Sequence, residues 1–354
     1  MRRLYLLGIV SVFLTVALMG AVTEKRRQKL YILSSHGDDV TVLDVATNKI
    51  IKTITVGKDP HGIAAPKSEE VLWVATEGDG TVSAIDPVRD EVIAQYNFFG
   101  NRPNEIEITS DGRILYVPVL GEGLYKVFDT VDKKIIAKIP TDGYPHNAVV
   151  SPDDRYMYLS PYDRGKAPPE KVAAQGLPTT LNKKIYIVDT KTHTVAGTIP
   201  TGNTPRPIVL SKDGTRLYVN TDDWMGFLVL DIPNRKVLHQ VEYGLTPEEK
   251  AITSRSHGIG ITPDQKEVWS TDTNHSLVFV YERMPEPPRQ IARIPVGKVP
   301  YWMVFTPDGK TCYVANTGDD TVSAIDVATK KERTRISVGK GKAPKRLLVL
   351  NVKE

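Results

Sequence analysis

Seven polar side chains recur at one step of a repeated phrase, and their chemistry suits proton transfer, anion binding or metal binding. They are His61, Asn104, His146, Arg206, His257, Tyr301 and Lys345. Six of the seven directly follow a proline, which marks the same step in each repeat. A position that only packs would show Val, Ile or Ala here, so this polar set predicts a shared centre.

A second set of residues lies sixteen positions further along, at the end of the next predicted strand. Its members are Glu77, Leu120, Tyr162, Asp222, Thr273 and Thr317, with Ser35 matching Lys345 through the two chain ends. His61 with Glu77 can form a general acid–base couple or two ligands of a divalent metal ion. Arg206 with Asp222 is typical of a structural ion pair.

The repeat unit is about 42 residues long and carries four strand signals, which is typical of a β-propeller blade. It reads most clearly as Tyr313-Val-Ala-Asn-Thr-Gly-Asp-Asp-Thr-Val-Ser-Ala-Ile-Asp326. Related versions start at Tyr31, Trp73, Tyr116, Tyr158, Tyr218 and Trp269. The sequence therefore predicts an all-β fold, a seven-bladed β-propeller with four-stranded blades.

The predicted ring occupies residues 29–354 as a single domain and is closed by its own ends. Inner strands are expected near Pro60, Pro103, Pro145, Pro205, Ser256, Pro300 and Pro344. The last of these, 345–350, has no blade of its own and should pair with 31–33. Because this pairing places the C-terminal strand in the N-terminal blade, no strand edge is left exposed.

These motifs resemble the YVTN family of β-propeller repeat proteins over nearly the whole predicted ring. The resemblance is carried by 313–316 with 321–326, and by Trp73-Val-Ala-Thr76 with Thr81-Val-Ser-Ala-Ile-Asp86. It implies the fold but little about function, since such repeats specify blade packing.

A partial resemblance to virginiamycin B lyase-type propellers concerns the site alone. Those propellers have an axial histidine and a metal-binding glutamate on the tunnel face, and His61 with Glu77 resembles that pair. His257 departs from the pattern, because Asp272 and Thr273 stand at the comparable place. Lactonase-type propellers offer a second analogy, which extends only to the fold class.

Two connections are longer than the repeat requires, 163–182 and 244–253. Connections of these two kinds leave a propeller on the same face, so they predict a lid or a partner surface over the tunnel; neutral surface insertions are the alternative. His36 and His275 fall in loops on that face, as further site members or as solvated residues.

Three interpretations of the polar ring remain open: ordered water, a bound ligand or partner, and catalysis. We expect an exported protein that binds a small, anionic ligand or a protein partner on the long-loop face. The expected ligand-binding residues are His61, Asn104, His146, Tyr162, Arg206, Asp222, His257, Tyr301, Trp302 and Lys345. Cationic Arg206 and Lys345 favour an anionic group, and the aromatic residues offer stacking surface.

The alternative is a metal-assisted lyase or hydrolase at the same ring. Its catalytic residues would be His61, Glu77 and His257. One divalent metal ion would be held by His61, Glu77, His146 and His257. A metal ion or the basic residues would then stabilise developing negative charge while a histidine moves the proton.

Composition and the N-terminus predict where the protein acts. The chain has 354 residues, 40% of them hydrophobic, and a formal charge of +4, which indicates a large core and no general affinity for nucleic acid. Residues 1–24 combine two arginines with the apolar run 4–22, typical of a signal peptide or an N-terminal anchor. We therefore expect a periplasmic or secreted protein that contacts membrane only through this segment.

Overall fold

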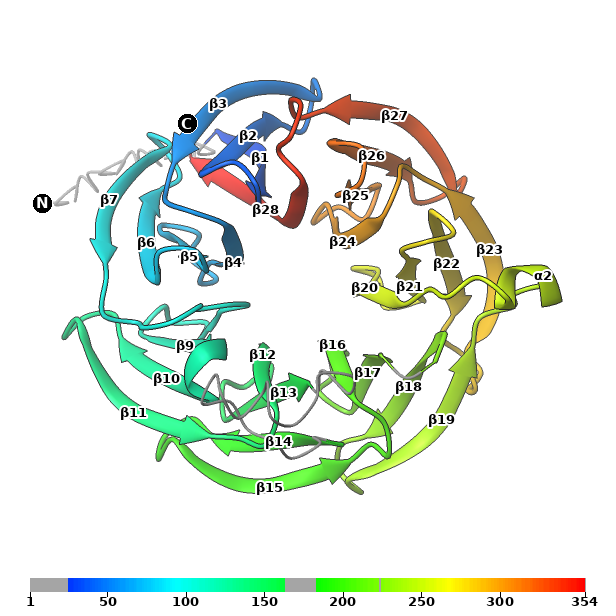
Figure 1. Cartoon of the computed structure of the whole chain (residues 1–354), viewed down its shortest axis with the longest axis horizontal. Coiled ribbons are helices and arrows are strands. Elements are labelled where there is room, and N and C mark those ends of the chain that lie inside the picture. Colours follow the sequence, from blue (N-terminus) through cyan, green and yellow to red (C-terminus); the bar gives the residue numbers. More distant parts are fainter. Residues whose placement is uncertain (1–24, 163–182, 223, 354) are drawn as a thin grey trace, which may run out of the picture.

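The computed structural model describes residues 25–162, 183–222 and 224–353, and the account below concerns these residues. They form an all-β ring of seven four-stranded antiparallel sheets around a common axis, a seven-bladed β-propeller (Figure 1). The fold predicted from the repeats is confirmed. Residues 1–24 lie outside the described part, so the predicted signal peptide or anchor stays a prediction.

Each blade runs from an inner strand at the axis to an outer strand at the rim. Blade 1 consists of β28 (Pro344–Lys353), β1 (Arg26–Ser34), β2 (Asp39–Asp44) and β3 (Lys49–Thr55). Blade 2 consists of β4 (Pro60–Ala64), β5 (Leu72–Thr76), β6 (Thr81–Asp86) and β7 (Glu91–Tyr96). Blade 3 consists of β8 (Glu107–Ile108), β9 (Ile114–Val119), β10 (Leu124–Asp129) and β11 (Lys134–Pro140). Blades 4 and 5 are β12 (Tyr144–Val150), β13 (Tyr156–Tyr162), β14 (Lys184–Asp189) and β15 (Thr194–Pro200); and β16 (Pro205–Leu210), β17 (Arg216–Thr221), β18 (Gly226–Asp231) and β19 (Lys236–Glu242). Blades 6 and 7 are β20 (Ser256–Ile261), β21 (Glu267–Asp272), β22 (Leu277–Glu282) and β23 (Arg289–Pro295); and β24 (Pro300–Phe305), β25 (Thr311–Asn316), β26 (Thr321–Asp326) and β27 (Lys331–Ser337). Two short helical turns, η1 (Leu120–Glu122) and α2 (Pro247–Lys250), lie in connections.

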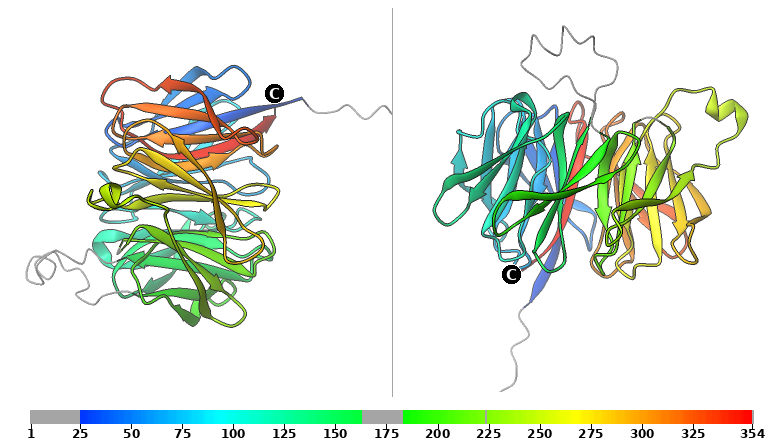
Figure 2. Two further views of the ribbon diagram at one scale, coloured as in Figure 1. Left: turned by 90° about the vertical axis from the view of Figure 1, so that its right-hand side faces the viewer. Right: turned by 90° about the horizontal axis from the view of Figure 1, so that it is seen from below.

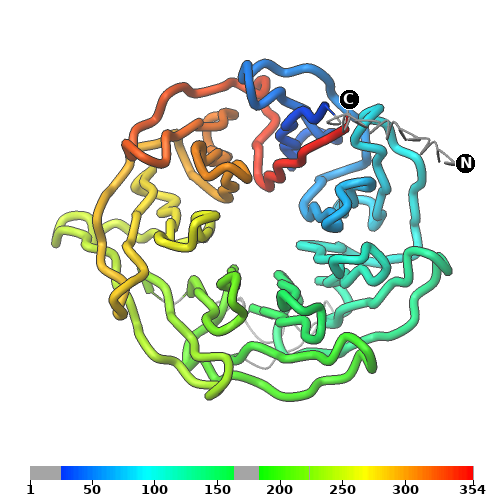
Figure 3. The backbone as a smooth tube through the Cα atoms, turned by 180° about the vertical axis from the view of Figure 1, so that it is seen from behind, coloured from blue at the N-terminus to red at the C-terminus, as the bar shows by residue number. Residues whose placement is uncertain are grey.

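The ring is closed by the strand that the sequence predicts. β28 pairs antiparallel with β1 from Arg26 opposite Lys353 to Ser34 opposite Pro344, so both ends of the chain complete blade 1. Figure 3 shows the last strand of the chain (red) beside the first described strand (blue) in this blade. All seven blades are therefore complete, each with four paired strands.

Apolar side chains hold neighbouring blades together face to face. Seven buried clusters each combine residues of two adjacent blades. The aromatic residue that opens the repeated phrase supplies large members of these clusters: Tyr31, Tyr218, Trp269 and Tyr313 are almost fully buried. The outer strands are largely exposed, as the pattern of β3 illustrates. The repeated motif therefore mainly specifies how neighbouring blades pack against each other.

The inner strands carry a recurrent β-bulge at the step occupied by the polar ring. The pairing of inner with second strand shifts between Pro60 and Gly62, and at the matching step in blades 1, 4, 5, 6 and 7. A bulge re-aims the side chains of the residues it contains. In blade 3 the inner strand was predicted to start near Pro103, which is wrong: only an isolated bridge joins Pro103 to Val119, and β8 starts at Glu107.

The two faces of the ring differ. Inner strands start at one face, here called the ring face, and α2 lies at that face, whereas the C-terminus lies at the other (Figure 2). The 244–253 connection, which contains α2, lies on the ring face, as the sequence predicts for this connection. The long 163–182 connection lies outside the described residues, so its predicted role as a lid stays a prediction. Within the described residues, no helix is long and apolar enough to cross a bilayer.

Glycine is required where neighbouring inner strands approach most closely. A Cβ on Gly258 would lie 2.5 Å from the carbonyl oxygen of Tyr301, which is backbone and cannot move aside. A Cβ on Gly260, two residues along the same strand, would instead meet the side chains of Phe305 and Met303 at 3.1 and 3.4 Å.

We therefore predict that Gly258→Ala lowers the free energy of unfolding by about 1–3 kcal/mol, the usual cost of overpacking. Gly260→Ala, the matched control in the same strand, should cost less because side chains can adjust. Urea unfolding followed by circular dichroism measures both. Equal destabilisation by the two variants would contradict the close backbone approach.

Candidate functional site

The predicted pairing of the two residue sets appears as one repeated backbone hydrogen bond. The amide of Glu77 donates to the carbonyl oxygen of Asp59, two residues before His61, at 2.9 Å. The same bond joins Leu120 to Arg102, Asp222 to Thr204, Thr273 to Arg255, Thr317 to Val299 and Ser35 to Ala343. In blade 4, Tyr162 pairs with Tyr144 in the ladder. The strand-end residue of each blade therefore lies beside its own inner strand, on the ring face.

His61 lies between a lysine and two carboxylates. Its Nδ1 atom is 3.1 Å from Nζ of Lys345 and 3.3 Å from Oε1 of Glu77. Its Nε2 atom is 3.8 Å from Oε1 of Glu105. A neutral imidazole with its proton on Nε2 can accept a hydrogen bond from the ammonium of Lys345 at Nδ1. This arrangement could pass a proton between the ring and a carboxylate.

Glu77 is a buried carboxylate with strong partners. Its Oε1 atom accepts a hydrogen bond from the side-chain amide of Asn104, and its Oε2 atom is 2.9 Å from Nη2 of Arg102. Since a buried charge is tolerated only when it is paired and hydrogen-bonded, these two residues keep Glu77 available as an anion beside His61.

Glu105 is a further site residue that the predicted set does not contain. Its side chain is 0% exposed, and its Oε2 atom is 2.9 Å from Nε of Arg346. Burial raises the pKa of its carboxyl to about 7, although nearby Arg346 and Lys345 oppose that rise. Glu105 therefore changes charge near neutral pH, directly behind His61.

Aromatic rings fill the side of the axis contributed by blades 6 and 7. The imidazole of His257 stacks on the ring of Tyr301 with 3.6 Å between centroids, and its centroid is 5.2 Å from that of Trp302. The guanidinium of Arg346 lies 3.9 Å above Trp302, and Nζ of Lys345 lies 5.4 Å from the centroid of Tyr301. These cation–π contacts connect the aromatic side to the charged side of the axis.

The contacts continue through blades 4 and 5. The rings of His146 and His257 are 6.1 Å apart, and His146 lies edge-on to Tyr162 at 5.3 Å. The guanidinium of Arg206 lies 3.9 Å above Tyr162, and its Nε atom is 2.7 Å from Oδ2 of Asp222. The predicted ion pair between Arg206 and Asp222 is therefore present at the axis.

All three axial histidines are held in the neutral form. Burial lowers the pKa of His61 well below its ordinary value, and Lys345 and Arg102 add to this. Burial also lowers the pKa values of His146 and His257 well below the ordinary value, and Arg206 is the next cause for both. Burial is therefore the main reason that the histidines are neutral, and the nearby cations reinforce it.

Several buried polar atoms at the axis lack a hydrogen-bond partner among the described residues. They are Nδ1 of His146, Nδ1 of His257, Nε1 of Trp302 and Oδ1 of Asn104, together with atoms that form ion pairs but no hydrogen bond, namely both carboxylate oxygens of Glu105 and Nε of Arg206 and of Arg346. Because buried polar groups are normally satisfied, atoms of this kind point to a missing water or ligand. They include both donors and acceptors, which suits a polar ligand.

A metal ion is not favoured by this arrangement. Among the described residues, no three His, Cys, Asp or Glu side chains are grouped so that they could hold one. The predicted ligands are instead separated by other partners: His61 faces Lys345, whereas His257 stacks on Tyr301. The divalent ion stays a prediction, and the chemistry below does not use it.

The structure brings all ten predicted ligand-binding residues into one contact network. We call this network, with the added residues, the axial cluster. It consists of His61, Glu77, Arg102, Asn104, Glu105, His146, Tyr162, Arg206, Asp222, His257, Tyr301, Trp302, Lys345 and Arg346. That the cluster binds a ligand stays a prediction.

Glu105 could have been found from the sequence by one added rule. Both Glu105 and Arg346 directly follow a ring residue, the place that Gly62 and Gly258 occupy in other blades. In an ordinary ladder that neighbour would point away from the axis, but the bulge allows both residues to reach it.

The loop histidines differ from each other. His36 is exposed, as one of the two predictions allows. His275 is not solvated: its Nδ1 atom is 2.6 Å from Oδ2 of Asp272, its Nε2 atom is 3.0 Å from the carbonyl oxygen of Glu249, and its side chain is buried. Because Glu249 belongs to α2, His275 attaches this short helix to blade 6 and is a structural residue.

Comparisons with known proteins support the fold and leave the family open. No protein-family model matches the chain, and no curated protein matches it. Among solved structures it resembles Kuenenia stuttgartiensis hydrazine synthase, with 20% identity, 85% of this chain and 92% of that chain covered, and a TM-score of 0.72. It also resembles the periplasmic gluconolactonase of Pseudomonas aeruginosa, with 18% identity, coverage of 92% and 99%, and a TM-score of 0.72.

A third similar structure is a putative 6-phosphogluconolactonase of Bacteroides fragilis, with 15% identity, coverage of 94% and 100%, and a TM-score of 0.71. The protein is thus a propeller with neighbours among lactonase-like proteins. At such identities the likeness concerns the fold alone, because one propeller scaffold carries many unrelated activities.

The neutral histidines predict how stability depends on pH. Below their ordinary pKa the unfolded chain binds protons that the folded protein refuses, so the free energy of unfolding should fall as the pH decreases from about 7 to about 5. Glu105 acts oppositely, because its raised pKa lets the folded protein keep a proton that the unfolded chain releases. Glu107, whose pKa burial also raises to about 7, acts in the same direction as Glu105, and the three histidines outweigh these two carboxyls.

We predict that His257→Gln makes the free energy of unfolding less dependent on pH between about 7 and about 5. Gly260→Ala, which alters no titrating group, should leave the slope unchanged. Urea titrations at several pH values measure this. An unchanged slope in His257→Gln would show that this imidazole has the same pKa in the folded and the unfolded protein, which would contradict the shift.

Proposed function

We propose that this protein is an exported propeller of the YVTN type that binds a small anionic ligand at the axial cluster. The observation that carries the proposal is that the basic side chains of Lys345, Arg206 and Arg346 reach the same cluster as the three buried histidines. All three are buried and neutral, and Lys345, Arg206 and Arg346 contribute to lowering the pKa of His61 and His146. An anion beside these cations would gain favourable electrostatic energy while the histidines offered it neutral hydrogen-bonding groups.

The exposure of individual residues suggests how such a ligand would enter. Lys345 and Tyr301 are only half-buried, and Arg102 is 40% exposed, whereas the histidines lie deeper. A ligand arriving from the ring face would meet Lys345 and Arg102 first and could then reach the unpartnered Nδ1 atoms of His146 and His257. A protein partner that inserts an acidic side chain would use the same contacts.

The first test is ligand-dependent melting with defined anions, namely gluconate, citrate and inorganic phosphate. We expect at least one to raise the melting temperature, and Lys345→Gln to weaken its binding about tenfold, the effect of losing a charged hydrogen bond. Lys298→Gln, an exposed lysine near the ring face but outside the axial cluster, is the control. A panel without any shift, or equal losses in both variants, would contradict anion binding at the axis.

Proton uptake would accompany such binding. Burial is the main cause of the low pKa values of the histidines, and nearby cations add to it; an anion that offsets these cations would raise the pKa values, so the histidines would take up protons and affinity would rise as the pH falls below about 7. Calorimetry in two buffers of different ionisation enthalpy measures this uptake. Proton release instead of uptake would contradict the proposed electrostatics.

A hydrolase is the second candidate, favoured by the group of His61, Glu77 and Glu105. A histidine between two carboxylates, one of them with a pKa of about 7, has the parts of a general acid–base relay at neutral pH. Lys345, 3.1 Å from His61, could stabilise an oxyanion. A gluconolactonase among the structural neighbours makes a lactone a reasonable substrate class to test.

The test is hydrolysis of D-glucono-1,5-lactone above the spontaneous rate. We expect His61→Asn to abolish enzymatic hydrolysis, and Glu105→Gln to lower the rate about 100-fold and to remove its titration near pH 7. His275→Asn, outside the axial cluster, should retain activity. No hydrolysis above the background by the wild-type protein would exclude this substrate, and equal activity of His61→Asn would exclude this relay.

A further inference from the structure

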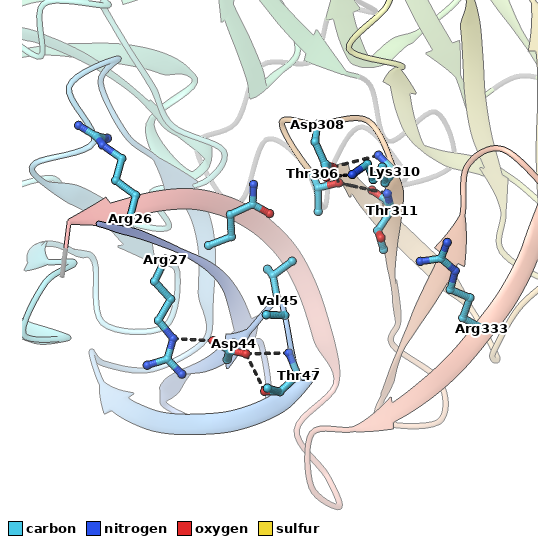
Figure 4. A pocket seen from close by; sticks show the side chains of 12 residues that line it. Arg26, Arg27, Asp44, Val45, Thr47, Thr306, Asp308, Lys310, Thr311 and Arg333 are labelled. Carbon is cyan, nitrogen blue, oxygen red and sulfur yellow. Dashed lines mark hydrogen bonds and ion pairs between the residues drawn. The ribbon is translucent and has the colours of Figure 1, made fainter. Parts of the chain in front are cut away.

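A second cavity lies on the face opposite the axial cluster, where the ring closes. It has a volume of about 650 Å³ and separates blade 1 from blade 7 (Figure 4). Its walls are the first residues of β1, the turn after β2, the turn between β24 and β25, and the start of β27. The cavity is therefore built from both ends of the repeat series.

The cavity is lined mainly by basic and hydroxyl side chains. Its charged lining residues are Arg26, Arg27, Lys310 and Arg333, against Asp44 and Asp308. The hydroxyl groups of Thr47, Thr306 and Thr311 also line it. Guanidinium groups with nearby hydroxyls and an ammonium are the usual partners of a phosphate group in proteins.

The two acidic side chains are already bound within their own turns. Oδ1 of Asp44 accepts hydrogen bonds from the amide and the hydroxyl of Thr47, at 2.7 and 2.6 Å. Oδ1 of Asp308 likewise accepts from the hydroxyl of Thr306 at 2.6 Å and from the amide of Lys310 at 3.1 Å. These bonds lower the pKa values of both aspartates, so the turns depend on them as anions.

Arg27 is in an ion pair with Asp44, but two other basic side chains are exposed to an incoming anion. The side chain of Lys310 is 77% exposed, with Nζ 3.7 Å from Oδ2 of Asp308, and that of Arg333 is 57% exposed and in an ion pair with Asp326. Nη1 of Arg26 donates to the carbonyl oxygen of Asn351 at 3.1 Å. A bound anion could therefore share these groups without breaking the turns.

The position of the cavity along the chain indicates where its anion comes from. Arg26 and Arg27 begin β1 at this face, and the apolar run 4–22 precedes them by only a few residues. Four extended residues span at most about 14 Å, so a membrane contact made by that run would hold the cavity near the lipid surface. A basic group beside an apolar segment provides the two signals that durable membrane attachment requires.

We propose that this cavity binds the phosphate group of an anionic phospholipid and so docks the face opposite the axial cluster onto a membrane surface. Binding is electrostatic and chiefly involves Arg26, Lys310 and Arg333, with the hydroxyl of Thr311 as an additional donor, since those of Thr47 and Thr306 already donate to Asp44 and Asp308. It does not depend on what the axial cluster binds. Each basic residue near a charged bilayer contributes about fivefold to binding.

The experiment compares the full-length chain with two triple variants of equal net charge. Arg26→Gln/Lys310→Gln/Arg333→Gln changes the cavity. Lys266→Gln/Arg89→Gln/Lys134→Gln is the control: Lys266 occupies the turn position of Lys310 in the preceding blade, and exposed Arg89 pairs with Asp86 as Arg333 pairs with Asp326. Each protein is sedimented with phosphatidylcholine vesicles, with and without phosphatidylglycerol, at low and high salt.

We expect the wild-type protein and the control to prefer vesicles with phosphatidylglycerol at low salt, and the cavity variant to lose that preference by about tenfold or more. Equal losses in the two variants would overturn the site in favour of general charge. No preference for phosphatidylglycerol in the wild type would overturn membrane docking. If inorganic phosphate alone protects the wild type but not the cavity variant from thermal unfolding, while vesicles show no preference, the cavity takes a soluble phosphate and the lipid source is wrong.

Discussion

The site depends on one constraint, the crowding of seven inner strands around a single axis. Gly62 shows its severity, because a Cβ there would lie 2.1 Å from the backbone oxygen of Asn104. A regular ladder cannot continue through such close contacts, and six inner strands bulge at this step. The bulges turn polar side chains toward the axis, where many of them bond to one another.

This crowding bears on whether the axis holds only water. If the axis held only water, neutral polar side chains such as those of serine and asparagine would be enough to form hydrogen bonds with it. The axial cluster instead buries Glu77, Glu105 and Arg206, and burying charge is costly even when partners are good. The charged side chains also differ in the partners that they contact: those of Lys345 are a neutral imidazole and an aromatic ring. A centre shaped for an anion accounts for that pattern better than a wet tunnel does.

The sequence predicted most of the architecture because the architecture is local and repeated. The interval between aromatic residues such as Trp73 and Tyr116 reports blade size, and the unpaired strand at the C-terminus reports ring closure. The sixteen-residue offset holds because inner and second strands form a hairpin with a fixed turn. Blade 3 was less predictable, since the stretch from Asn104 to Glu107 replaces a ladder with an irregular turn that periodicity does not reveal.

Contacts between segments that the repeat does not relate to each other could not be predicted from the sequence. Glu105 reaches Arg346 only because blade 1 is assembled from both chain ends and lies beside blades that contribute to the same axis. His275 was expected in solvent, but the capping box of α2 brings the carbonyl oxygen of Glu249 to its ring. Each of these contacts depends on a loop path that residue types alone do not specify.

The basic side chains on the two faces of the ring differ in their partners and in their exposure. At the axis, cations are packed on aromatic rings and carboxylates, which fixes their positions and suits selection of a particular ligand. At the closure cavity, Lys310 and Arg333 are exposed, which suits a surface such as lipid headgroups. Because β1 and β28 run between the faces, docking through the cavity would direct the ring face away from the membrane and leave Lys345 and Arg102 open to solvent. The closure of the ring would thereby determine how the protein is oriented as well as how it is held together.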